Sequence, residues 1–187
     1  MKQTVDKIFE KAITFHREGK LKEAEPHYRS LLKIQPKHID SNNNLGSLLN
    51  NLGRLEEAEQ FLIKAIELKP DYAEAYNNIG LIFWKQKKFK ESLNNFEKAI
   101  VLKSDYAQAH SNLGNALVTF NRFHEAEKSY RKAIDLKPDY ADFYSNIAVL
   151  LQTVGRLEEA EKNARKAIDL KPDYAEAYSN LSSILQN

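Results

Sequence analysis

The feature that most constrains the fold of this chain is a residue position that recurs at a fixed spacing. A proline, or in one case a serine, stands every 34 residues along most of the sequence. The positions are Pro36, Pro70, Ser104, Pro138 and Pro172. A constant period of this length is typical of a stacked repeat array, because one unit alone is too small to bury its apolar face. The spacing therefore favours an extended recognition surface over a catalytic pocket.

Each period contains two apolar stretches at helical spacing, separated by a short break. In residues 107–140 they read His110-x2-Leu113-Gly114-x2-Leu117, followed by Ala126-x3-Tyr130. In residues 73–106 they read Tyr76-x2-Ile79-Gly80-x2-Phe83, followed by Ser92-x3-Phe96. This order resembles the tetratricopeptide repeat (TPR), a helix–turn–helix unit of 34 residues. The resemblance implies an all-α fold, a right-handed TPR superhelix (an alpha-alpha solenoid) of paired antiparallel helices.

The resemblance divides the chain into five full repeats and one terminal helix. The expected units are 5–38, which is the most divergent, 39–72, 73–106, 107–140, 141–174 and the partial unit 175–187. Two columns of small residues are predicted to let the paired helices approach toward the lower end of the usual ~8–10 Å range. One holds Gly46, Gly80, Gly114 and Ala148, and the other holds Ala58, Ser92, Ala126 and Ala160.

Turn and cap residues recur with the same period. Between the two helices of a unit stand Gly19, Gly53, Asn121 and Gly155, which suit a left-handed helix end. Lys87 occupies this place in one unit, and we expect a backbone strain of about 1 kcal/mol there. Between units, Asp71-x-x-Glu74 and Asp173-x-x-Glu176 match the capping-box pattern, which predicts that these aspartates cap the following helices.

Composition excludes several classes of function. Lys+Arg 28 against Asp+Glu 26 leaves a net charge of +2, and the single basic cluster, Lys85 to Lys90, is interpreted as a solvated turn. We therefore expect no nucleic acid as partner. No apolar run of about 18 residues exists, so no membrane partner is predicted. The absence of cysteine is compatible with the cytoplasm, which is the predicted location.

The sequence offers no constellation of catalytic groups. No phosphate-binding loop, nucleophile elbow or H-E-x-x-H motif occurs, and none of the five histidines forms an i, i+3 or i, i+4 pair on one helix. His110 stands in a column otherwise filled by tyrosines and is interpreted as a packing residue. We therefore predict no enzymatic activity, no cofactor and no metal.

One recurring position in the repeats is explained neither by helix packing nor by a turn or a helix cap. An asparagine stands in the middle of the first predicted helix of five successive units, although asparagine is a poor residue for a helix interior. This asparagine column consists of Asn44, Asn78, Asn112, Asn146 and Asn180. Here the sequence is similar to the TPR region of O-GlcNAc transferases and their bacterial relatives. In that family the corresponding asparagines form a ladder on the concave face and hold substrate peptides, so the resemblance implies a peptide-binding column here.

An alternative remains for this column, namely that each asparagine caps or bridges a neighbouring repeat. Asn43, Asn77, Asn115 and Trp84 are predicted to line the same groove, although Trp84 also suits a packing role. The groove is expected to be polar and neutral. Co-chaperone TPRs hold a terminal carboxylate with Lys and Arg, whereas this chain has acidic or amide side chains near the helix starts. A carboxylate clamp is therefore disfavoured.

The predicted function is a non-catalytic scaffold for protein–protein interaction that binds extended peptide segments of a partner along the asparagine column. Two alternatives stay open. The chain is an assembly module, a homo-oligomer through the terminal helix, where Leu181, Ile184 and Leu185 are expected to be uncovered. Otherwise it is the substrate-recruiting region of a larger glycosyltransferase.

Overall fold

The chain is all-α, which confirms the predicted fold class. The computed structural model describes residues 2–186, with side chains from Val5 onward, and within this part eleven α-helices form and no strand. The bounds are α1 Lys2–Arg17, α2 Leu21–Ile34, α3 Ile39–Asn51, α4 Leu55–Leu68, α5 Ala73–Lys85, α6 Phe89–Leu102, α7 Ala107–Thr119, α8 Phe123–Leu136, α9 Ala141–Thr153, α10 Leu157–Leu170 and α11 Ala175–Leu185.

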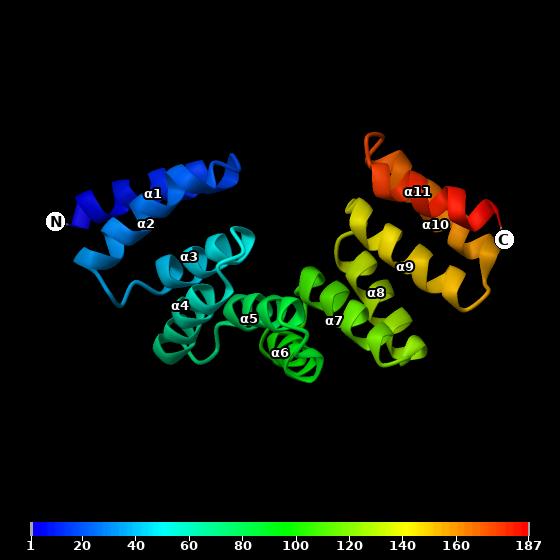
Figure 1. Ribbon diagram of the computed structural model, residues 1–187, viewed down its shortest axis with the longest axis horizontal. Coiled ribbons are helices and arrows are strands. Elements are labelled where there is room, and N and C mark those ends of the chain that lie inside the picture. Colours follow the sequence, from blue (N-terminus) through cyan, green and yellow to red (C-terminus); the bar gives the residue numbers. More distant parts are fainter. Residues whose placement is uncertain (1, 187) are drawn as a thin grey trace. The chain divides into compact units, whose positions relative to one another are not determined.

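The helices pack in sequential pairs, each an odd-numbered first helix with the even-numbered second helix that follows it (Figure 1). The chain divides into two compact units, unit 1 (Met1–Leu102) and unit 2 (Lys103–Asn187). Within unit 1, α2 packs on α3, α4 packs on α5, and the first helices α3 and α5 touch each other. Within unit 2, α8 packs on α9, and the first helices α7, α9 and α11 contact one another in succession. The first helices α3 and α5 in unit 1, and α7, α9 and α11 in unit 2, therefore share a continuous surface.

At the small residues of the first helices, a ring or a branched side chain from the second helix packs against the backbone. A Cβ added to Gly80 would lie 2.5 Å from Cε1 of Phe96, and one added to Gly114 would lie 2.5 Å from Cε1 of Tyr130. In the column of small residues on the second helices, Ser92 forms a hydrogen bond: its Oγ donates to the backbone oxygen of Gly80 at 2.8 Å. Gly80 and Gly114 are thus required by the aromatic side chains, whereas a Cβ on Gly46 would lie 2.6 Å from Leu62 Cγ and 3.1 Å from the backbone oxygen of Ala58.

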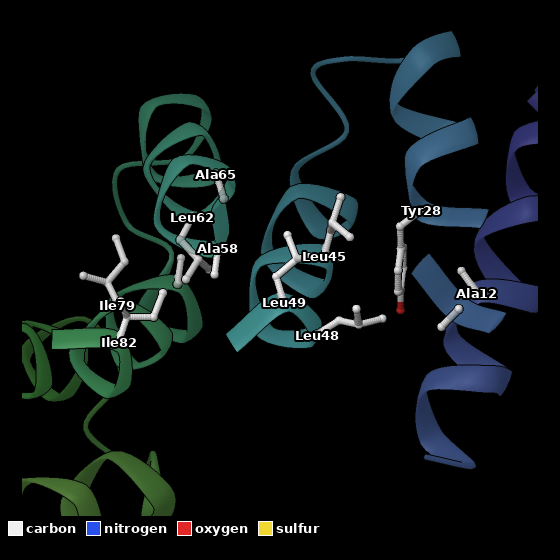
Figure 2. Packing of buried hydrophobic residues seen from close by; sticks show 12 residues of the cluster. Ala12, Tyr28, Leu45, Leu48, Leu49, Ala58, Leu62, Ala65, Ile79 and Ile82 are labelled. Carbon is white, nitrogen blue, oxygen red and sulfur yellow. The ribbon is translucent and has the colours of Figure 1, made fainter. Parts of the chain in front are cut away.

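The core of unit 1 runs across repeat boundaries. Figure 2 shows Tyr28 of α2 with Ala12 of α1 on one side and Leu48 of α3 on the other, and all three are fully buried. The same cluster continues through α4 to Ile79 and Ile82 of α5. Neighbouring repeats therefore bury each other's apolar faces, which explains why the unit folds as an array.

The turns inside the repeats are left-handed, as the sequence predicts. Gly19, Gly53 and Gly155 have φ values of +73°, +78° and +77°. Asn121 has φ +56° and Lys87 has φ +60° at the equivalent places. Lys87 is the residue for which this conformation is least favourable, because its side chain offers no local hydrogen bond as asparagine does.

The predicted capping boxes are wrong. The N-cap residues of α5 and α11 are Tyr72 and Tyr174, one residue later than the aspartates, and neither makes a side-chain capping bond. Tyr72 instead donates its hydroxyl to Asp40 Oδ1 of the preceding repeat at 2.8 Å. A side-chain cap does occur at α3, where the Ser41 amide donates to His38 Nδ1 at 3.1 Å. At the start of α5 the junction residue Tyr72 therefore connects one repeat to the next and does not cap the helix, whereas His38 caps α3.

Candidate functional site

In unit 1 the asparagine column forms an amide chain between repeats. Asn78, half-buried in the middle of α5, donates through Nδ2 to Asn43 Oδ1 of α3 at 2.9 Å. Asn43 in turn donates through its own Nδ2 to Asn44 Oδ1 at 3.2 Å. Asn78 and Asn43 thereby connect α5 with α3 of the preceding repeat.

Unit 2 repeats the arrangement with serine as the acceptor. Asn146 Nδ2 of α9 donates to Ser111 Oγ of α7 at 3.1 Å. Asn180 Nδ2 of α11 donates to Ser145 Oγ of α9 at 3.0 Å. In each case the acceptor belongs to the residue just before the asparagine of the preceding repeat. The alternative that these asparagines bridge neighbouring repeats is therefore confirmed for Asn78, Asn146 and Asn180.

Bridging uses only half of each amide. Within residues 2–186, Oδ1 of Asn78, Asn146 or Asn180 accepts no hydrogen bond from the protein. In the described chain, the buried polar atoms without a hydrogen-bond partner include Asn50 Oδ1 but none of these three oxygens. Since they have no partner in the protein and are not buried, the three oxygens are accessible to solvent. An asparagine can thus hold the repeat junction through Nδ2 and still present an acceptor at the surface.

The other predicted site residues lie deeper or serve packing. Asn43 and Asn77 are only 6% and 4% exposed, so they lie beneath the surface. Asn115 Oδ1 accepts the Tyr130 hydroxyl at 2.7 Å, and burial raises the pKa of Tyr130. Trp84 is half-buried, with its ring edge-to-face against Phe89 at a centroid distance of 5.1 Å. The structure thus gives Asn115 and Trp84 contacts within their own repeats, while Asn112 is half-buried in α7.

Charge differs from one first helix to the next: α1 has more Lys and Arg than Asp and Glu, whereas α7 has none of these four residue types. In unit 2, α7, α9 and α11 contain two carboxylates, Asp142 and Glu176, and no lysine or arginine. In unit 1, α3 and α5 contain Asp40, Glu74 and one lysine, Lys85, whose ammonium donates to the Asn50 backbone oxygen at 2.9 Å.

Ion pairs formed by residues of the second helices and by their N-cap arginines connect adjacent repeats. In unit 2, Arg156 binds Glu127 at 2.7 Å and also Glu159, while Arg131 binds the same two carboxylates at 2.7 and 3.3 Å. Unit 1 has the same four-membered network at the equivalent positions, formed by Glu25, Arg29, Arg54 and Glu57. The pKa of Glu127 lies below its usual value, with burial opposing the two arginines.

Two further properties bear on the kind of site. In the described part of the chain, no group of three or more His, Asp or Glu side chains is placed to hold a metal ion. Among the helices of residues 2–186, none has both the length and the apolar character needed to cross a membrane.

Family models described as tetratricopeptide repeat match residues 38–105 and 71–139, and a second such model matches residues 112–175. These matches together span well over half of the chain. No curated protein matches it. Among solved structures, TTC0263, a thermophilic TPR protein of Thermus thermophilus, superposes with a TM-score of 0.84 at 20% identity, over 98% of this chain and 100% of that one.

Two other solved structures are similar. A MamA structure has a TM-score of 0.69 at 25% identity, covering 88% of this chain and 96% of that chain. YrrB, described as a TPR protein with an unusual peptide-binding site, has a TM-score of 0.65 at 20% identity, covering 92% of this chain and 89% of that chain. At these identities, the likenesses to TTC0263 and YrrB concern the fold.

Proposed function

This chain belongs to the tetratricopeptide repeat family, and from that membership we propose that it is a non-catalytic scaffold that binds extended peptide segments of partner proteins. TPR proteins generally mediate protein–protein interactions. The binding surface is formed by the first helices within each unit, with the asparagine column as its polar contact. YrrB, one of the similar structures, is described as having a peptide-binding site, which is consistent with this class of ligand.

The observation that carries the proposal is the open acceptor on each bridging asparagine. A half-buried amide with one group fixed by the protein is pre-ordered, so a ligand loses little side-chain entropy when it binds there. Successive first helices lie about 10 Å apart and an extended chain advances about 3.3 Å per residue, so one rung meets roughly every third ligand residue. Regular acceptors at that interval suit a backbone in extended conformation.

Replacing Asn78, Asn146 and Asn180 together by leucine is expected to weaken peptide binding by at least about tenfold, because the ligand loses three hydrogen-bond acceptors. A library of extended peptides, selected first on the wild-type protein, provides the ligands, and fluorescence anisotropy gives the dissociation constants. The matched control replaces Asn94 and Asn163 by leucine, since both lie on second helices. Equal binding by the wild type and the column variant, with matching helical content and melting temperature, would show that the column is purely structural.

A second candidate function, assembly through α11, is favoured by one specific observation. Leu185 is 58% exposed, whereas Leu151, at the equivalent position of α9, is fully buried. Leu181 is half-buried, while Ile184, which the sequence predicted to be uncovered, is only 3% exposed because α11 packs on α9 and α10. The uncovered part of α11 is therefore narrower than expected and centres on Leu185.

Charge indicates what fits against this face. Glu161 and Arg165 of α10 pair at 2.8 Å, and they occupy the places that Glu127 and Arg131 occupy in α8. At α8 the network is completed by Arg156, the N-cap residue of α10, and by Glu159 of α10, an arginine followed three residues later by a glutamate. We therefore assign to the α11 face an amphipathic partner helix that begins with Arg-x-x-Glu and has a small apolar stripe.

A peptide with the sequence of residues 155–170, which contains this pattern, is expected to bind the protein in the micromolar range. The substitutions Leu181→Glu and Leu185→Glu should abolish that binding, because each places a charge against the apolar stripe. Calorimetry measures the affinity, and a peptide with the arginine and glutamate exchanged is the control. Binding that survives both leucine substitutions would eliminate α11 as the docking face.

A further inference from the structure

The turn between α5 and α6 differs in charge from the four equivalent turns of the chain. Residues 85–91 contain four lysines and one glutamate, which is a net charge of +3. The corresponding segments 17–23, 51–57, 119–125 and 153–159 have net charges of +1, −1, 0 and −1, with histidine counted as neutral. All four lysines are exposed, and together they are named the basic turn: Lys85, Lys87, Lys88 and Lys90.

The cations of the basic turn also lack carboxylate partners within the described chain. In each of the other four turns, the cation that follows the left-handed residue pairs with a glutamate of the same turn. The pairs are Lys20–Glu18, Arg54–Glu57, Arg122–Glu125 and Arg156–Glu159. Lys88 holds that place in the basic turn, and its ammonium lies over the Phe83 ring, 5.3 Å from the centroid. Like charges without counter-charges create a positive local potential that attracts anions.

Lys87 stands in this turn at a cost to the backbone. Its φ is +60°, in the left-handed region that Gly19, Gly53 and Gly155 occupy at the equivalent places. A residue with a Cβ is strained there, whereas glycine is not. Within the described chain, the Lys87 side chain forms no hydrogen bond, ion pair or ring contact that could compensate this strain. A contact outside the chain would account for a lysine at this place.

The aromatic side chains of the turn indicate which kind of anion fits. Trp84 is half-buried, with its ring edge-to-face against Phe89, and the half-buried Phe83 ring lies beneath the Lys88 ammonium. No large apolar side chain of residues 84–90 is exposed. A membrane surface is bound through exposed apolar side chains, and single-stranded nucleic acid through aromatic faces on which bases stack. The basic turn presents ammonium groups alone, which suit carboxylates.

We infer that the basic turn docks an acidic segment of a partner protein, whose aspartate or glutamate side chains pair with Lys87, Lys88 and Lys90. The ammonium of Lys85 is held by a backbone oxygen of α3 and supports the potential of the turn from there. Asn78 lies seven residues before Lys85 in α5, which is about two helical turns. The inference therefore concerns a surface separate from the asparagine column and goes beyond the proposed function.

The experiment uses four probes: a capped peptide of four Glu-Gly units, the same peptide with Gln-Gly units, single-stranded oligothymidine, and vesicles of phosphatidylserine and phosphatidylcholine. Fluorescence anisotropy, or co-sedimentation for the vesicles, measures binding at about 50 mM and about 300 mM salt. The variants Lys87→Gly and Lys87→Gly/Lys90→Glu introduce the residue types of segment 51–57. The matched control, Lys128→Gln/Lys132→Glu, changes the net charge by the same amount as the double variant, on exposed residues of α8.

The Glu-Gly peptide should bind the wild type at least about tenfold more tightly than the Gln-Gly peptide, and more tightly than the other two probes. The higher salt concentration should remove most of this preference. Lys87→Gly should weaken the binding at least about threefold and raise the melting temperature by about 2–4 °C, because glycine removes the strain. The double variant should lose at least about tenfold in affinity, and the control variant less than about threefold.

Weaker binding by a more stable variant is a result that a purely structural lysine would not give. If Lys87→Gly binds the Glu-Gly peptide as the wild type does, or if the control variant loses as much affinity as the double variant, the inference is wrong. If oligothymidine or the vesicles bind more tightly than the peptide and lose that binding in the double variant, the assigned class of partner is wrong. If none of the four probes binds, the inference fails, whereas binding of the extended-peptide library would still support the asparagine column.

Discussion

Replacing Phe96 by alanine is expected to lower the free energy of unfolding of unit 1 by about 3–5 kcal/mol, a large loss for a single substitution. The Phe96 ring is 1% exposed and lies against Gly80 in the crossing of α5 and α6. The cavity left by the ring would stay unfilled on the side of α5, because Gly80 has no side chain that could occupy it. Urea denaturation followed by circular dichroism measures the loss.

The reverse change, Gly80→Ala, is expected to be unfavourable on its own. Its methyl group would lie 2.5 Å from the ring, and such overpacking costs about 1–3 kcal/mol, against a gain of up to about 1 kcal/mol from helix propensity. The double variant Gly80→Ala/Phe96→Ala should recover part of both losses, because the new methyl group occupies space that the ring has left. The chain already uses this solution at Ala148 and Ala164, both fully buried. Strictly additive losses in the double-mutant cycle would show that the two positions do not share one cavity.

The array is expected to lose stability in alkaline solution through Tyr28. Burial raises the pKa of Tyr28 to about 12, from an ordinary value of 10.0. The unfolded chain therefore releases this proton at a lower pH than the folded chain. The stability that Tyr28 confers is complete below pH 10 and is lost as the pH rises toward 12. The loss amounts to about 2–3 kcal/mol for this residue.

Urea unfolding at about pH 9 and about pH 11.5 tests this expectation. The variant Tyr28→Phe is the control, because it keeps the ring between α1 and α3 and removes the ionisable group. Its stability should fall less over that interval than that of the wild type, with Tyr130 and the remaining tyrosines contributing equally to both. Parallel losses in the two proteins would mean that the Tyr28 hydroxyl ionises as freely in the folded state as in the unfolded one.

The repeat, the helix pairs and the left-handed turns follow from the sequence because each depends on residues close together in the chain. Gly53, Asn121 and Lys87 are examples, since a turn is a local event. The capping-box prediction was wrong because of a tertiary contact. Tyr72 is the N-cap residue of α5, and its hydroxyl donates a hydrogen bond to Asp40 in the preceding repeat.

The partner of an asparagine in the column could not be predicted either. The acceptor of Asn146 is Ser111, and the spacing that brings them together is set by the packing of α7 on α9 rather than by any local rule. The column could be found by its period, but the direction of its hydrogen bonds needed the structure. The likeness to the arrays of O-GlcNAc transferases stays a prediction.

The amide bridges of unit 2 would also couple ligand binding to the contact between repeats. An amide that accepts a hydrogen bond at its oxygen becomes a better donor at its nitrogen, because polarisation passes through the group. A donor seated on Asn146 or Asn180 would therefore tighten the bond from that residue to the preceding repeat. Unit 2 would therefore be stiffer when a ligand is bound to these asparagines than when none is bound.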